Sequence, residues 1–216
     1  MTASRQKYIE EHAAEAMEQM RRYGIPASIT LAQGIIESAE GKSMLSRTAN
    51  NHFGVKGEFN GQFVRADDDK PNEKFKKYDN VGQSYEDHSK VLMADRYQKY
   101  TRNLSADDYK GWAAGIKAGG YATAKNYVST IVGVIEGANL QKYDQMVIEQ
   151  AKREGKKIGT TDYRKGDVSA TPATSVTAKP TPNGLYSLPL KREEFMLVTS
   201  PFGNRRYPMD HSKTQF

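Results

Sequence analysis

The sequence predicts a mainly α (α+β) fold, in which a domain of roughly five or six helices carries one small β-lobe. Apolar residues recur at helical spacing before residue 40 and again after residue 80. Between these segments, residues 53–78 alternate aromatic and valine positions loosely with Gly, Asn and Asp, which favours an antiparallel hairpin. Apolar periodicity is lost beyond Glu154, so we expect the helical domain to end between Asp144 and Arg153.

Glycine and proline bound the first two predicted helices. The first spans residues 4–23, because Gly24 and Pro26 follow it, and Pro26 suits the first turn of the second helix. The second helix runs into the stretch LAQGIIESAEGKS, and residues 41–57 are too rich in Ser, Asn and Gly to continue it. The apolar face of the first helix consists of Ile9, Ala13, Ala16, Met20 and Tyr23.

Helical signals return in the second half of the domain. Ser84 with Asp87, and Ser105 with Asp108, have the spacing of an N-terminal capping box. Gly119 and the glycine after it end one apolar stripe, and a second stripe follows. The two stripes are Tyr109, Trp112, Ala113 and Ile116, and then Tyr127, Ile131, Val134 and Ile135.

Composition divides the chain into three parts. We expect a helical domain over residues 4–150, a flexible linker rich in Thr, Ala, Pro and Lys over residues 151–184, and a partial β segment over residues 185–216. The last part regains Leu, Phe, Val and turn residues, but is too short for a core of its own.

Charge and composition narrow the classes of function. The 216 residues carry a formal net charge of +6, which favours an anionic partner such as a cell wall. Acids lie between the basic residues along the whole chain, so we expect no nucleic-acid partner. Cysteine is absent, which excludes disulfides and thiolate metal sites. No apolar run approaches the roughly 20 residues that span a bilayer, so we expect no membrane insertion.

The stretch LAQGIIESAEGKS places an acid, Glu37, where an apolar helix opens into a loop. A carboxyl group half removed from water is costly unless it has a partner or a chemical role. Four stretches are then found in order, AQGIIES, NNHFGVKG, FKKYDNVGQSYEDHSKVL and GGYATAKNYVSTI. Over residues 5–145 they resemble the bacterial cell-wall N-acetylglucosaminidases of the flagellar-hydrolase type, glycoside hydrolase family 73.

This resemblance implies a lysozyme-like helical lobe with a β-hairpin lobe that closes over a groove for glycan. It also implies hydrolysis of the β-1,4 bond between N-acetylglucosamine and N-acetylmuramic acid in peptidoglycan strands. We expect no cofactor, no metal and a monomer that acts in the periplasm or at the cell wall. The first 20 residues lack the apolar stretch of a secretory signal, so a signal for export would lie outside this chain or have been removed.

Glu37 matches the general acid of that family. Glycoside hydrolysis needs a carboxylic acid whose pKa is raised toward neutral, and partial desolvation by Ile35 and Ile36 suits such a shift. The alternative is that Glu37 merely forms a salt bridge with a nearby Lys or Arg. Glu40, one helical turn further on, is interpreted as a solvated acid.

The second carboxylate is expected on the hairpin, where the sequence offers Asp67, Asp68, Asp69 and Glu73. Glu73 is the first choice and Asp68 the second. For either residue, a charged hairpin tip without a chemical role is the alternative. A further alternative is that the 2-acetamido group of the substrate assists in place of a second carboxylate.

Other residues match positions of the family. Tyr121 matches a tyrosine beside the acid, and its hydroxyl could contact the acetamido group or orient a water. Tyr127 is interpreted as core or as a wall of the groove. Asn51, Phe53 and Gly54 match a turn into the hairpin that shapes the groove, with Gly54 allowing a sharp reversal.

Three further side chains are assigned by their surroundings. Trp112 is expected in the core. His88 lacks a second ligand nearby, so a hydrogen-bonded helix histidine is preferred to a metal ligand. His52 is placed in the loop beside the groove.

The segment VTSPFGNRRYPM resembles the start of the lysostaphin-type zinc endopeptidases. His211 lies before the position of that family's first ligand, and the chain ends at Phe216, so we predict no zinc peptidase activity and a fragment of a longer two-enzyme hydrolase. Two alternatives to a glucosaminidase stay open. One is a lytic transglycosylase or muramidase on the same fold, and the other is a non-catalytic wall-binding scaffold of a secretion or conjugation apparatus.

Overall fold

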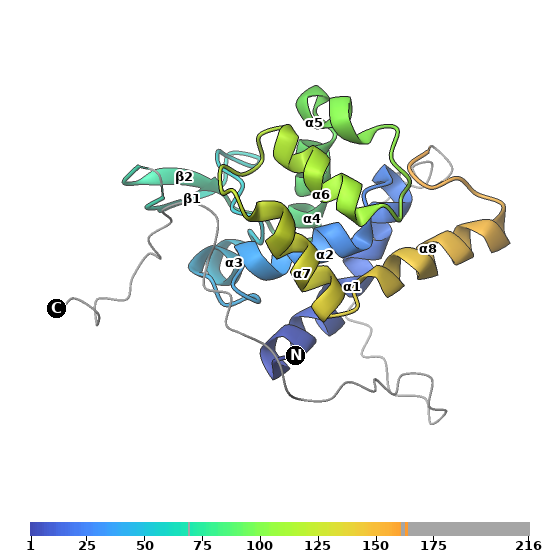
Figure 1. Cartoon of the computed structure of the whole chain (residues 1–216). Coiled ribbons are helices and arrows are strands. Elements are labelled where there is room, and N and C mark those ends of the chain that lie inside the picture. The colour runs from blue at the N-terminus through green and yellow to red at the C-terminus, as the bar shows by residue number, and fades with distance from the viewer. Residues whose placement is uncertain (69, 161–162, 164–216) are drawn as a thin grey trace.

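The helical body carries a small hairpin at one end. The computed structural model describes residues 1–68, 70–160 and 163. Within them the chain forms eight helices and one two-stranded antiparallel sheet, which confirms the predicted fold class. The hairpin lies on the side of α3, away from α8 (Figure 1). In chain order the elements are α1 Ala3–Tyr23, α2 Ala27–Glu37, α3 Met44–Ala49, β1 Phe63–Ala66, β2 Glu73–Lys76, α4 Val81–Leu92, α5 Asp95–Thr101, α6 Tyr109–Ala118, α7 Tyr127–Gly137 and α8 Gln141–Glu154.

Helix α2 is the buried centre of the body. It packs against α1, α6, α7 and α8, and every residue from Ala27 to Ile35 is buried. A helix enclosed on all sides is apolar nearly all round, which explains why its buried residues other than Gln33 are small or aliphatic. Gly34 permits the closest approach, because a Cβ there would lie 2.6 Å from Tyr8 Oη and 3.2 Å from Tyr85 Oη.

A buried carboxyl group holds the start of α2. Asp144 of α8 accepts hydrogen bonds from Ser28 N at 2.8 Å and Ser28 Oγ at 2.5 Å. Burial raises the pKa of Asp144 to about 7, although the hydrogen bonds from Ser28 oppose that shift. An acid at a helix N-terminus satisfies free backbone N–H groups, so α8 fixes where α2 begins.

The hairpin pairs β1 with β2 in the register Val64 with Phe75 and Arg65 with Lys74. Phe75 is buried, whereas Arg65 is exposed. Lys56, in the loop that enters the hairpin, forms an isolated bridge with Phe75. This contact ties the loop after α3 to the second strand.

The two predicted capping boxes are wrong, and α3 was not predicted. The side chain of Asn80 caps α4 by accepting from Gln83 N, and Ser84 is buried inside that helix. Asp108 caps α6, so Ser105 lies outside it. Ser43 caps α3, within a segment whose Ser and Asn residues favour loops but also serve as helix caps.

The C-terminal assignments lie almost wholly outside the described residues. These are the linker over 151–184 and the partial peptidase domain over 185–216, so both stay predictions. Helix α8 continues to Glu154, a few residues past the predicted domain limit of 150. Among the described helices, none has both the length and the apolar character needed to cross a bilayer.

Candidate active site

Glu37 is the last residue of α2, and the chain reverses directly after it. Ser38 Oγ donates to Gly34 O at 2.6 Å and accepts from Gly41 N at 2.8 Å. Ala39 follows with a φ of 50°, in the left-handed region that non-glycine residues rarely adopt. The tight reversal leaves the Glu37 carboxyl part-buried at the C-terminal end of the central helix.

Glu40 is a part-buried ion-pair partner, which corrects its interpretation as a solvated acid. Arg5 Nε lies 3.2 Å from its carboxylate, and only 16% of the Glu40 side chain is exposed. Burial alone would raise the pKa of Glu40, but the hydrogen bond from Ser4 and the charge of Arg5 outweigh it and hold the pKa below its usual value. Glu40 therefore fastens the reversal after α2 to α1.

Tyr127 is a core residue on which the charge of Glu37 acts. Its hydroxyl accepts a hydrogen bond of 2.8 Å from Gln33 Nε2, and its side chain is fully buried. Burial raises the pKa of Tyr127, the bond from Gln33 opposes this, and the charge of Glu37 raises it further. Gln33 precedes Glu37 by one helical turn, so both project toward α7. The sequence predictions missed Gln33, although its spacing from the acid was the available signal.

Tyr121 lies in the loop between α6 and α7 and packs against Tyr127. The two ring centroids are 5.8 Å apart, and Tyr121 is half-buried. The centroid of its ring also lies 6.3 Å from that of Tyr97 and 6.3 Å from that of His88, to which it is perpendicular. Tyr121 thus packs on Tyr127, and the charge of Glu37 acts on Tyr127; we call these three residues the acid cluster.

His88 joins this cluster to the loop before the hairpin. Its ring stacks on Phe53 at 3.8 Å, and both side chains are buried. Within the described residues neither ring nitrogen of His88 has a hydrogen-bond partner, which corrects the expected hydrogen-bonded histidine. Burial lowers the pKa of His88 to about 3, so the ring is neutral.

Asn51 and Gly54 set the course of that loop. The Asn51 side chain accepts from Val55 N at 3.0 Å and donates to Lys76 O at 2.8 Å. Gly54 has a φ of 61°, which a glycine adopts without strain. Phe53 is buried beneath the loop. These residues shape the loop, as the sequence suggests, and their contact with a substrate stays a prediction.

His52 belongs to a buried polar group with Tyr8 and Tyr85. Its Nδ1 and Tyr8 Oη share a hydrogen bond of 2.9 Å, and Tyr8 Oη also lies 3.0 Å from Tyr85 Oη. Burial, and then the nearby His12, lower the pKa of His52 to about 4.

Trp112 is buried, as predicted for a core residue. Among the residues that the structure describes, no group of three or more His, Asp or Glu side chains is arranged to hold a metal.

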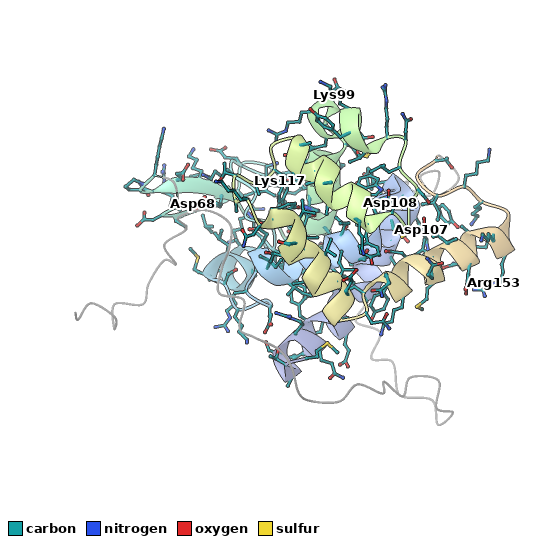
Figure 2. The ribbon with its side chains drawn as sticks, viewed as in Figure 1. Asp68, Lys99, Asp107, Asp108, Lys117 and Arg153 are labelled. Carbon is teal, nitrogen blue, oxygen red and sulfur yellow. The ribbon has the colours of Figure 1, made fainter. Side chains whose placement is uncertain are left out.

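The two hairpin acids meet at one lysine. Lys56 Nζ lies 3.0 Å from both carboxylate oxygens of Glu73 and 3.1 Å from Asp68. Only 8% of the Asp68 side chain and 21% of the Glu73 side chain are exposed. Figure 2 shows Asp68 on the hairpin, apart from the helical body. The sequence predictions missed Lys56, because its partners lie more than ten residues away in the chain.

Comparison with known proteins identifies the family of this domain. Residues 13–140 match the family described as "Glucosaminidase: Mannosyl-glycoprotein endo-beta-N-acetylglucosaminidase". Exo-glucosaminidase LytG of Bacillus subtilis (strain 168) is 32% identical over 152 residues, which cover 65% of this chain and 54% of that protein. A probable N-acetylmuramidase of Lactococcus lactis subsp. lactis (strain IL1403) is 30% identical over 159 residues, covering 66% of this chain and 36% of that protein.

A solved structure resembles the fold as well. It is the catalytic domain of the autolysin Auto from Listeria monocytogenes, with a TM-score of 0.59 and 30% identity. The likeness covers 66% of this chain and 89% of that domain.

The helical body and its hairpin therefore define a domain of the lysozyme-like class. The chain belongs to the glucosaminidase family. It spans about half the length of the exo-glucosaminidase and about a third of the muramidase.

Proposed function

We propose that this chain is a peptidoglycan hydrolase that cuts the β-1,4 bond between N-acetylglucosamine and N-acetylmuramic acid, with Glu37 as the general acid. Membership of the glucosaminidase family supports the reaction class. The observation that carries the assignment is the position of Glu37. It is an acid at the end of the buried central helix, close enough to Tyr127 for its charge to raise that residue's pKa.

The surroundings of Glu37 suit an acid that must keep its proton. The negative end of the α2 dipole disfavours a carboxylate at the helix C-terminus. Removal of part of its water acts in the same direction. In the proposed step, the carboxyl proton passes to the glycosidic oxygen as the bond from that oxygen to the anomeric carbon breaks. Tyr121 supplies a hydroxyl that orients the attacking water or the 2-acetamido group.

Glu73, with Asp68 as the alternative, is the proposed second carboxylate. Lys56 forms ion pairs with both acids and so holds the two carboxylates together, as expected of a base or an electrostatic partner for positive charge on the sugar ring. The hairpin would bring this pair toward the sugar when glycan binds. If neither acid acts, the 2-acetamido group of the substrate takes that part.

A pair of matched variants tests the assignment of the acid. Glu37→Gln should lower the rate of clearing of purified peptidoglycan by about 10²- to 10⁴-fold, which is several kcal/mol in the barrier. Glu40→Gln is the control, because it removes an acid three positions away whose partner is Arg5. Melting temperatures should show that both variants are folded. Clearing that survives Glu37→Gln would contradict Glu37 as the general acid. A wild-type chain that binds the wall but clears no peptidoglycan would favour the wall-binding scaffold instead.

A muramidase is the second candidate, because one relative is named a probable N-acetylmuramidase. Mass spectrometry of the digested glycan separates the possible products. A reducing N-acetylglucosamine end supports the proposed bond, whereas a reducing N-acetylmuramic acid end indicates a muramidase. A 1,6-anhydro-muramic acid end indicates a lytic transglycosylase.

A hydrolase of peptidoglycan must reach the cell wall, so the proposed function includes export of this protein.

A further inference from the structure

The loop that carries Tyr121 has few backbone bonds of its own. It leaves α6 through Gly120, whose φ is 84°, and Tyr121 N donates to Ile116 O at 3.2 Å. From residue 122 to 126, no backbone N–H of this described segment donates to another backbone carbonyl. Such a segment is held in place by side chains or is free to move.

Lys117 bonds to two carbonyl groups of this loop. It is the basic residue in the last turn of α6, and its part-buried Nζ donates to Ala122 O at 3.5 Å and to Ala124 O. Ala124 O also accepts from Tyr127 N at 3.3 Å, at the start of α7. Figure 2 shows Lys117 near the end of α6, on the side where the chain turns toward α7. One ammonium group therefore links the end of one helix to the start of the next, across the loop that carries Tyr121.

We propose that Lys117 is a positioning residue, which holds the loop so that the Tyr121 hydroxyl meets the substrate. The proposal rests on the proposed hydrolase function and on the part assigned to Tyr121 in it. An ammonium group bonded to backbone carbonyls fixes their directions, and Tyr121 is adjacent to the first of them. The rings of Tyr127, Tyr97 and His88 hold the Tyr121 side chain, but they do not fix the backbone on its C-terminal side.

The first measurement needs no activity. In Lys117→Met, hydrogen–deuterium exchange followed by mass spectrometry should be faster in peptides covering residues 119–127 and unchanged elsewhere. Lys110→Met is the matched control, since it removes a lysine of the same helix that pairs with Glu136 on the surface. Unchanged exchange in residues 119–127 would overturn the proposal whether or not the chain cuts glycan.

The second measurement is a double-mutant cycle with Tyr121→Phe. Lys117→Met alone should lower kcat by about 10- to 100-fold, as expected for a misplaced reacting group, with little change in KM. Combined with Tyr121→Phe it should cause no further loss, and Lys117→Arg should keep most of the activity. An equal loss in both backgrounds, or no loss in either, would overturn the proposal. If the wild type cuts no glycan, the proposed function fails, and the exchange experiment alone decides the role of Lys117.

Discussion

Two acids three residues apart have different surroundings at the end of α2. Glu40 is held by Arg5 and has its pKa lowered, whereas Glu37 lies at the helix end beside the buried phenol of Tyr127. A residue bound in an ion pair is a poor proton donor, because its partner stabilises the charged form. At the scale of single residues, the ion pair with Arg5 therefore gives Glu40 a structural role, and Glu37 stays the proposed catalytic acid.

The hairpin acids yield a prediction at the same scale. Glu73→Gln should lower kcat by about 10²-fold or more, since it removes the proposed second carboxylate. Asp68→Asn should have a smaller effect, because Glu73 remains paired with Lys56. Initial rates on purified peptidoglycan provide the measurement.

The reverse order of effects would make Asp68 the second carboxylate. If both variants keep full activity, assistance by the 2-acetamido group is favoured. Glu58→Gln is a suitable control, since that acid pairs with Lys74 on the same hairpin.

At the scale of elements, α2 is fixed at both ends and along its side. Asp144 accepts a hydrogen bond from its first turn, and Ser38 bonds to its last turn. The hydroxyl groups of Tyr8 and Tyr85 pack closely against Gly34. The helix that carries Glu37 is therefore held by groups from α1, α4 and α8. A rigid support of this kind keeps a catalytic group within the small tolerance that catalysis allows.

Gly34→Ala tests this support. The added methyl group would lie 2.6 Å from Tyr8 Oη, an atom that is buried and hydrogen-bonded to His52. Overpacking costs about 1–3 kcal/mol, and alanine regains about 1 kcal/mol of helix propensity, so we expect a net loss of stability of up to about 2 kcal/mol. Urea denaturation measures it, with Gly133→Ala on α7 as the control, because a Cβ there meets nothing. A Gly34→Ala variant as stable as the wild type would contradict the tight contact.

The sequence predicted elements whose signals are local. Apolar spacing with glycine or proline at the ends located α1, α2, α6 and α7. The caps were harder, because Asn80 and Asp108 each compete with a nearby Ser of similar capping preference. Contacts between distant segments, such as Lys56 with Glu73 or Arg5 with Glu40, leave no periodic pattern. The surroundings of the candidate site, unlike the position of Glu37, therefore required the structure.

At the scale of the whole molecule, the buried Asp144 makes stability depend on pH. Its pKa is raised from 3.8 to about 7 on folding. The folded state therefore binds a proton more tightly than the unfolded chain does, and this contribution is complete below about pH 4 and lost as the pH rises through about 7. The two hydrogen bonds from Ser28 remain at neutral pH but do not fully offset the burial of the charge.

Asp144→Asn should remove that dependence. Asparagine still accepts from Ser28 N and has no charge to bury. The free energy of unfolding of the wild type, relative to the variant, should therefore fall between pH 4 and pH 8, by at most about 4 kcal/mol. Urea denaturation at several pH values measures the difference. Parallel curves for the two proteins would show that Asp144 ionises as in the unfolded chain.

The contacts around α2 also define how much chain an excised domain must keep. The family match covers residues 13–140, yet Tyr8 and Asp144 lie outside it. A polypeptide trimmed to those limits would lose the anchor at the start of the central helix and the phenol that fits against Gly34. Anyone dissecting this protein should therefore set the cuts by its packing, before residue 3 and after residue 154, and not by the borders of sequence similarity.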